Sequence, residues 1–72
     1  MEINKKVRVE GKVVEERVLS SGDRILNLDN GIVVFCSCSE NFNNKIAVIE
    51  GFVSVYNDEK QVTALRIFTN DN

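Results

Sequence analysis

Cys36 and Cys38 carry the most distinctive chemistry in this sequence, because two thiols separated by one residue can join in a disulfide or share a metal ion. On an extended strand, however, their Cα atoms would lie about 6.6 Å apart, near the outer limit for a disulfide. The pair also supplies only half of the roughly four ligands of a structural zinc site, and the sequence holds no other cysteine and no histidine. We therefore expect two free thiols, no metal site and no bound cofactor.

Side chains that usually carry enzymatic chemistry are sparse. Histidine, the commonest general base at neutral pH, is missing, no serine lies in a nucleophile motif, and no glycine-rich phosphate loop precedes a helix. Glu10 and Glu50 occupy equivalent places in two similar strand patterns and would approach each other if those strands pair. We interpret them as outward-facing surface carboxylates, so the prediction is a protein without enzymatic activity.

Size and charge narrow the class of protein further. The 72 residues suffice for one small domain, spanning 1–72, and an apolar fraction of 43% is that of an ordinary globular protein. A net charge of −2 counts against a dedicated nucleic-acid binder, which is usually basic. No apolar run is long enough to cross a membrane, and the polar N-terminus is no secretory signal, so we expect a cytoplasmic protein.

The elements that would position these groups are β-strands. We expect five strands, because five segments are rich in β-branched residues and alternate apolar with polar positions: 7–19, 24–29, 32–37, 45–56 and 61–68. Glycines at 11 and 51 fall where a side chain should point inward, which indicates bends. We expect the strands to bury the following residues: Val7, Val9, Val13, Ala47, Ile49, Val53, Val62, Ala64 and Ile67. Polar residues 57–60 form a tight turn.

The segment between the third and fourth strands breaks the pattern. Residues 38–44 form either a single helical turn capped by Ser39 or an irregular loop with Phe42 plugging the core. Five bent strands without a long helix predict a small closed barrel, of the OB-fold or the SH3-like type, because closure removes exposed edges. The barrel would span about 6–68, between tails at 1–5 and 69–72.

Asn30-Gly31 predicts a two-residue type I′ turn between the second and third strands, because both central positions of that turn favour these residues. That turn sets the register and therefore the two faces of the hairpin. The expected core face carries Leu26, Leu28, Val33 and Phe35. The expected outer face carries Ile25, Asn27, Asp29, Ile32, Val34 and Cys36.

Four short patterns in this frame suggest a family: Val7-x-Val9-x-Gly11-x-Val13, Leu26-x-Leu28-Asp29-x-Gly31-x-Val33, Ile49-x-Gly51-x-Val53 and Gln61-Val62. Over residues 6–68 the chain resembles the nucleic-acid-binding OB-fold family, especially the small OB domains of archaeal replication protein A and of the anticodon-binding type. The resemblance implies an all-β, five-stranded OB-fold Greek-key barrel with a short connector or helical turn between strands three and four. The family often has a longer turn between strands two and three, typically Asp-x-Thr-Gly.

By position, the resemblance places the ligand groove over strands two and three, between loops 19–24 and 56–61. Single-stranded DNA or RNA binds such a groove through aromatic stacking and through cations along the phosphates. Tyr56 is the candidate for stacking. The expected nucleic-acid-binding residues are Arg17, Arg24, Asn27, Ile32, Val34, Tyr56, Lys60 and Arg66.

A protein partner is the alternative ligand for this surface. Ile32 and Val34 stand where the family often places polar or aromatic residues, and aliphatic side chains cannot stack on bases. A contiguous apolar patch on a small domain usually marks an interface. The alternative is therefore a module for protein interaction or dimerisation through Ile25, Ile32 and Val34.

Overall fold

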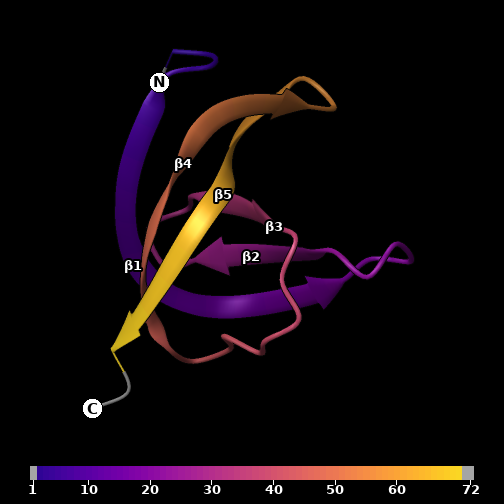
Figure 1. Ribbon diagram of the computed structural model, residues 1–72, viewed down its shortest axis with the longest axis vertical. Helices are drawn as coiled ribbons and strands as arrows, with labels where there is room; N and C mark the ends of the chain where they lie inside the picture. The colour runs from indigo at the N-terminus through magenta and orange to yellow at the C-terminus, as the bar shows by residue number, and fades with distance from the viewer. Residues whose placement is uncertain (1, 71–72) are drawn as a thin grey trace.

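Five β-strands make up most of residues 2–70, the part of the chain that the structure, a computed structural model, describes (Figure 1). The strands are β1 (Lys6–Val18), β2 (Arg24–Leu28), β3 (Val33–Cys36), β4 (Ile46–Tyr56) and β5 (Glu59–Asn70). They close into a barrel in the order β1-β2-β3-β5-β4, in which β3 and β5 are parallel and every other pair is antiparallel. The prediction of an all-β, five-stranded barrel is confirmed, and the architecture is compatible with an OB-fold.

Residues 2–70 contain no helix with the length and apolar character needed to cross a membrane.

The bend of β1 closes the barrel. Its first half, 6–12, pairs with β4, and its second half, 13–18, pairs with β2, so the strand wraps around the molecule (Figure 1). Gly11 lies at this bend, where a Cβ would approach the Cβ of Leu28 to 3.2 Å. Val14 is the extra residue of a bulge between the two halves and is exposed. The predicted bend at Gly11 is therefore confirmed.

The core lies inside the barrel and includes the inward residues expected for β4. Val53 and Ile49 are fully buried on either side of Gly51, and Ala64 and Ile67 pack against the core on both sides of a bulge in β5. The connector forms no helical turn: it is irregular, and Phe42 plugs the core with 5% of its surface exposed. The buried apolar residues are Val13, Leu26, Leu28, Val34, Cys36, Phe42, Ala47, Ile49, Val53 and Val62.

The β2–β3 hairpin differs in register from the prediction. Leu26 lies opposite Val34, whereas a two-residue loop at Asn30-Gly31 would place it opposite Phe35. A shift of one residue moves every side chain of a strand to the other face. The buried residues of β3 are therefore Val34 and Cys36, and the outer residues are Val33 and Phe35.

A three-residue loop produces the observed register. The amide of Gly31 donates to the carbonyl of Leu28 at 3.0 Å, and the amide of Leu28 donates to the carbonyl of Ile32 at 2.9 Å. Gly31 has a φ of 87°, the left-handed conformation that follows a type I turn in a three-residue hairpin loop. The predicted type I′ turn is wrong here because Asn30 does not adopt a positive φ.

Backbone and side-chain groups of this loop also bind it to β1. The amide of Asp29 donates to the carbonyl of Lys12 at 2.9 Å, and the Asn30 side chain donates to the carbonyl of Glu10, also at 2.9 Å. These bonds satisfy backbone groups of β1 beside the bend at Gly11, where β1 changes partner from β4 to β2. The loop therefore reverses the chain between β2 and β3 and also helps to hold the barrel closed at β1.

The type I′ turn occurs instead in the β4–β5 hairpin. Asn57 and Asp58 have φ values of 52° and 65°, and the flanking residues Tyr56 and Glu59 pair with each other. The predicted turn lies at the right place, although β5 begins at Glu59 rather than at residue 61. This hairpin projects from one end of the barrel (Figure 1).

Cys36 and Cys38 form a disulfide, so the prediction of two free thiols is wrong. The prediction assumed that both residues lie on an extended strand. In the structure β3 ends at Cys36, and the chain then leaves the extended conformation, which brings the two Cα atoms to 5.3 Å. That separation lies within the usual range for a disulfide.

Candidate functional site

The strand register sets three side chains in a row on the outer face of the barrel. Arg17 of β1 lies opposite Ile25 of β2, which in turn lies opposite Phe35 of β3. Phe35 lies between the buried residues Val34 and Cys36, and Ile25 precedes the buried Leu26, so both side chains point outward. Arg17 is exposed. The row places a cation, an aliphatic side chain and an aromatic ring next to one another.

The β4–β5 hairpin turns this row into the wall of a hollow. Tyr56 and Gln61 join Arg17, Ile25 and Phe35 around a cavity of about 100 Å³. A wider hollow of about 240 Å³ adjoins it and shares four of these residues. We call both together the groove, which is lined by Arg17, Leu19, Ile25, Val33, Phe35, Tyr56, Asn57, Glu59 and Gln61.

Aromatic surface in the groove comes from two rings. Tyr56 is 64% exposed at the end of β4, as the sequence indicated, and Phe35 is half-buried on β3. Such rings offer a face on which a nucleic-acid base can stack. The sequence reasoning missed Phe35 because the predicted register turned its side chain into the core.

Positive charge in the groove comes mainly from Arg17. This side chain is exposed and forms no ion pair with any residue in the described part of the chain. Lys60 is exposed on β5 opposite Val55, does not line the groove, and already makes a contact within the protein. Glu59 lines the wider hollow with the opposite charge. The lining of the groove therefore carries one charge of each sign.

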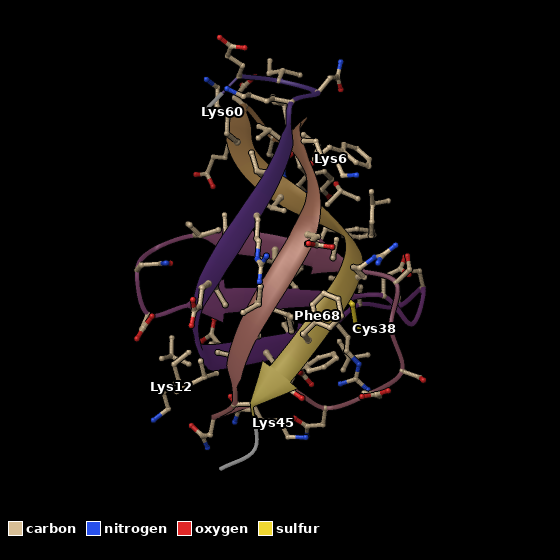
Figure 2. The ribbon with its side chains drawn as sticks, turned by 60° about the vertical axis from the view of Figure 1, so that its left-hand side comes forward. Lys6, Lys12, Cys38, Lys45, Lys60 and Phe68 are labelled. Atoms are coloured by element: carbon tan, nitrogen blue, oxygen red, sulfur yellow. A yellow bond between two sulfur atoms is a disulfide. The ribbon has the colours of Figure 1, made fainter. Side chains whose placement is uncertain are left out.

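Arg66 lies outside the groove. It is on the outer face formed by β1, β4 and β5, where its Nε lies 3.6 Å from a carboxylate oxygen of Glu50. Phe68 belongs to the same outer face, lies opposite Val48 and is 50% exposed (Figure 2). Arg66 lies opposite Glu50 in the middle of β4, whereas Tyr56 ends that strand, and Arg66 is not among the residues that line the groove.

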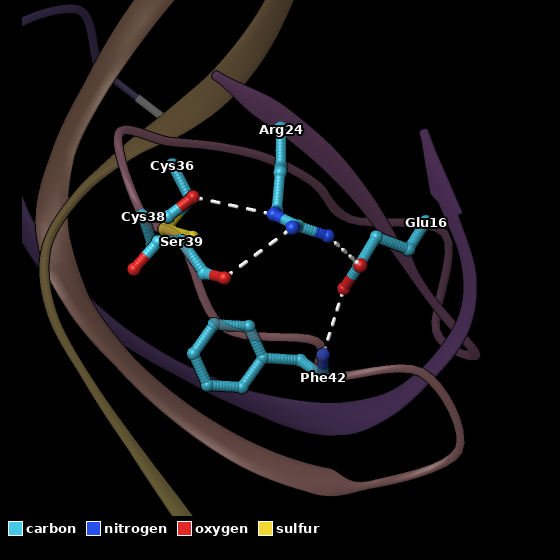
Figure 3. Close-up of a disulfide and its surroundings, with 6 residues drawn as sticks. All are labelled: Glu16, Arg24, Cys36, Cys38, Ser39 and Phe42. Atoms are coloured by element: carbon cyan, nitrogen blue, oxygen red, sulfur yellow. Dashed lines mark hydrogen bonds and ion pairs between the residues drawn. A yellow bond between two sulfur atoms is a disulfide. The ribbon is translucent and has the colours of Figure 1, made fainter. Parts of the chain in front are cut away.

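Arg24 is engaged inside the molecule rather than in the groove. Its guanidinium forms an ion pair with Glu16 and donates to the carbonyls of Cys38 and Ser39 at 3.2 and 3.3 Å (Figure 3). Glu16 also accepts a bond from the amide of Phe42 at 2.8 Å. The side chains of Arg24 and Glu16 are 17% and 6% exposed. The pair therefore holds the connector against the barrel.

The remaining expected site residues have different surroundings. Val34 is fully buried, so its predicted outward position is wrong, and Ile32 packs against the core from the β2–β3 loop. Asn27 does lie on the outer face, where its side chain donates to Glu15 at 3.0 Å. Of the residues expected from the sequence, the groove thus brings together Arg17 and Tyr56, whereas Lys60 is not among its lining residues.

Glu10 and Glu50 lie on paired strands but do not face each other directly. Glu50 lies opposite Arg8 and Glu10 lies opposite Val48, so the two carboxylates do not form a directly opposed pair. Within residues 2–70, no three side chains of the metal-ligating types lie close enough together to hold a metal ion.

Comparison with protein-family models gives no match for this chain, and comparison with curated proteins gives none either. The class that fold and groove define is thus a small five-stranded mixed β-barrel, compatible with an OB-fold.

Proposed function

We propose that the protein binds single-stranded nucleic acid in the groove and has no catalytic activity. The observation that carries this proposal is the arrangement of Phe35, Tyr56 and Arg17 around one hollow. Two rings can accept successive bases, and the guanidinium can contact a phosphate or stack on a base. The aliphatic side chain of Ile25 lies between Arg17 and Phe35 and would exclude water from the contact between a bound base and the groove.

The resemblance to the OB-fold family supports this choice of ligand. In that family the ligand lies over the second and third strands, between the loop that follows strand one and the turn that follows strand four. The groove of this protein occupies the same position, because its residues come from β2, β3, the end of β1 and the β4–β5 hairpin.

The composition of the groove predicts weak binding. Stacking on two rings contributes about 2–6 kcal/mol if each stacked base contributes about 1–3 kcal/mol. With one or two phosphate contacts in addition, we expect a Kd of about tens to hundreds of micromolar. The net charge of −2 also opposes association with a polyanion. We expect the protein to bind short single-stranded oligonucleotides of DNA and of RNA.

A salt titration with labelled oligonucleotides tests the proposal. Fluorescence anisotropy should show binding of single-stranded DNA or RNA at about 50 mM salt and several hundred micromolar protein. Because one or two cations contact phosphates, log Kobs should fall with log salt at a slope between about −0.7 and −1.4. Absence of binding under these conditions would refute the proposal.

Self-association through the same face is a second candidate. Ile25, Val33 and Phe35 form an apolar patch on the outer face of β2 and β3, and such a patch suits a second copy of the chain. Solution mass measured over a wide range of protein concentrations tests it. A mass that stays at that of one chain would exclude a homodimer.

A further inference from the structure

We propose that Cys36 and Cys38 form a reactive disulfide that exchanges with thiols, and that the sulfur of Cys38 is the one attacked. The two residues are joined across a single intervening residue, Ser37, at the point where β3 ends. Both line an open cavity of about 340 Å³ between the connector and β5. The substrate class is a dithiol, in a small molecule or in a peptide.

The surroundings of the two sulfurs are unequal. Cys36 is the last residue of β3, belongs to the core and is 5% exposed. Cys38 is only half-buried and packs against the core from the connector, which forms one wall of the cavity. Both residues line the cavity, but Cys38 is the more exposed of the two, so an attacking thiolate reaches Cys38 more readily than the largely buried Cys36. Exchange rates depend on such access to the attacked sulfur.

A purely structural role explains this disulfide poorly. The entropic stabilisation from a crosslink grows with the length of the loop that it closes, and this loop is as short as a C-x-C pair allows. The connector is also fixed independently, because Arg24 bonds the carbonyls of Cys38 and Ser39 and Glu16 accepts from the amide of Phe42 (Figure 3). The sulfur–sulfur bond can therefore open and close while the connector stays in place.

Oxidation of the dithiol substrate by the protein disulfide needs no reactant other than these two. A substrate thiolate attacks the sulfur of Cys38, the Cys36–Cys38 bond breaks, and its electron pair leaves on Cys36 as a thiolate. The second substrate thiolate then attacks the substrate sulfur of this mixed disulfide and releases Cys38 as a thiolate. The substrate has become a disulfide and the protein a dithiol, with two electrons transferred. Oxidised glutathione reverses these steps and regenerates the protein disulfide.

The cavity selects by access rather than by charge. Its wall carries one charge of each sign, from Arg66 and Glu40, so neither an anionic nor a cationic thiol is favoured. A small thiol and a cysteine pair in an extended peptide can both enter an open hollow of this size. Separate assays with the two kinds of substrate therefore identify the source of the thiols.

The first experiment measures how fast the native disulfide reacts. The oxidised protein is mixed with reduced glutathione, with dithiothreitol or with a peptide that carries two cysteines. Free thiols are then alkylated at set times, and mass spectrometry measures the fraction of protein that has been reduced. We expect the native protein to react within about tenfold of the rate of the urea-unfolded chain. Reduction that occurs only when urea unfolds the barrel would overturn the proposal.

Single-cysteine variants then test which sulfur is attacked. With oxidised glutathione, C36S should form a mixed disulfide at Cys38, and C38S should react at least about tenfold more slowly because Cys36 is buried. Equal rates would refute the assignment of Cys38. Circular dichroism checks the fold of each variant, and the wild-type rates decide the main proposal even if a variant fails to fold. Because the groove plays no part, failure of nucleic-acid binding leaves this test intact.

Discussion

Replacing Tyr56 by alanine separates the role of the groove from the stability of the barrel. Tyr56 is 64% exposed at the end of β4, so its truncation should change the free energy of unfolding by no more than about 0.5 kcal/mol. If a base stacks on this ring, the variant loses about 1–3 kcal/mol of binding free energy. That loss corresponds to a Kd about 5- to 150-fold higher.

Anisotropy titrations at fixed low salt measure this change. Phe68→Ala is the matched control, because Phe68 is an aromatic residue of similar exposure, 50%, on the outer face of β1, β4 and β5. We expect the control to bind like the parent protein. If Tyr56→Ala binds like the parent, or if Phe68→Ala weakens binding as much, then the groove as defined here does not hold the ligand.

Three further tests, two of them with a matched control variant, concern the charges and the backbone. Arg17→Ala should make the salt dependence of log Kobs shallower by about 0.7, as measured by titrations at several salt concentrations, and an unchanged slope would show that Arg17 contacts no phosphate. Glu16→Ala leaves a largely buried guanidinium unpaired and should cost about 3–5 kcal/mol in urea unfolding, whereas Glu50→Ala, in a more exposed pair, should cost less than about 1 kcal/mol. Gly51→Ala would place a Cβ 2.0 Å from a carbonyl oxygen of β5 and should cost more than about 2 kcal/mol. Gly22→Ala, with a positive φ but open space around it, should cost about 1 kcal/mol, so equal losses at the two glycines would contradict the close approach at Gly51.

Alternation of apolar residues was enough to predict the barrel. The patterns around Gly11 and Gly51 predicted the inward positions of β1 and β4, because a bent strand that is half inside a barrel keeps its period of two on either side of the glycine. Val62, Ala64 and Ile67 were all expected to point inward, and they share a face only because β5 has one extra residue at its bulge. Long, strongly patterned strands were therefore predictable from local sequence.

The register of the β2–β3 hairpin was not predictable from its turn residues alone. Asn30-Gly31 fits a two-residue type I′ loop, but glycine fits equally well as the last residue of a three-residue loop. In β3 the residues Val33–Cys36 are all apolar, so neither face looks more polar than the other. The bonds from Asp29 and Asn30 to β1 favour the longer loop, and these contacts form only in the closed barrel.

Two other features depended on the ends of elements, which a local pattern defines poorly. The disulfide required β3 to stop at Cys36, whereas the sequence analysis kept the chain extended as far as Cys38. Arg24 was expected to be a surface cation beside the groove, yet it pairs with Glu16 because the connector brings carbonyl groups to its guanidinium. Such long-range partners cannot be inferred from positions in one strand.

The corrected register makes the two proposed uses of the groove mutually exclusive. Phe35 and Ile25 are central both to the apolar patch that would face a second copy and to the hollow that would take bases. If the protein self-associates through this patch, a saturating oligonucleotide must therefore shift the solution mass towards one chain, by mass action. Ile25→Ser should weaken both kinds of binding, whereas a change at Val34, which is fully buried, would report on stability instead. A dimer whose mass does not respond to bound oligonucleotide would show that the two surfaces are separate.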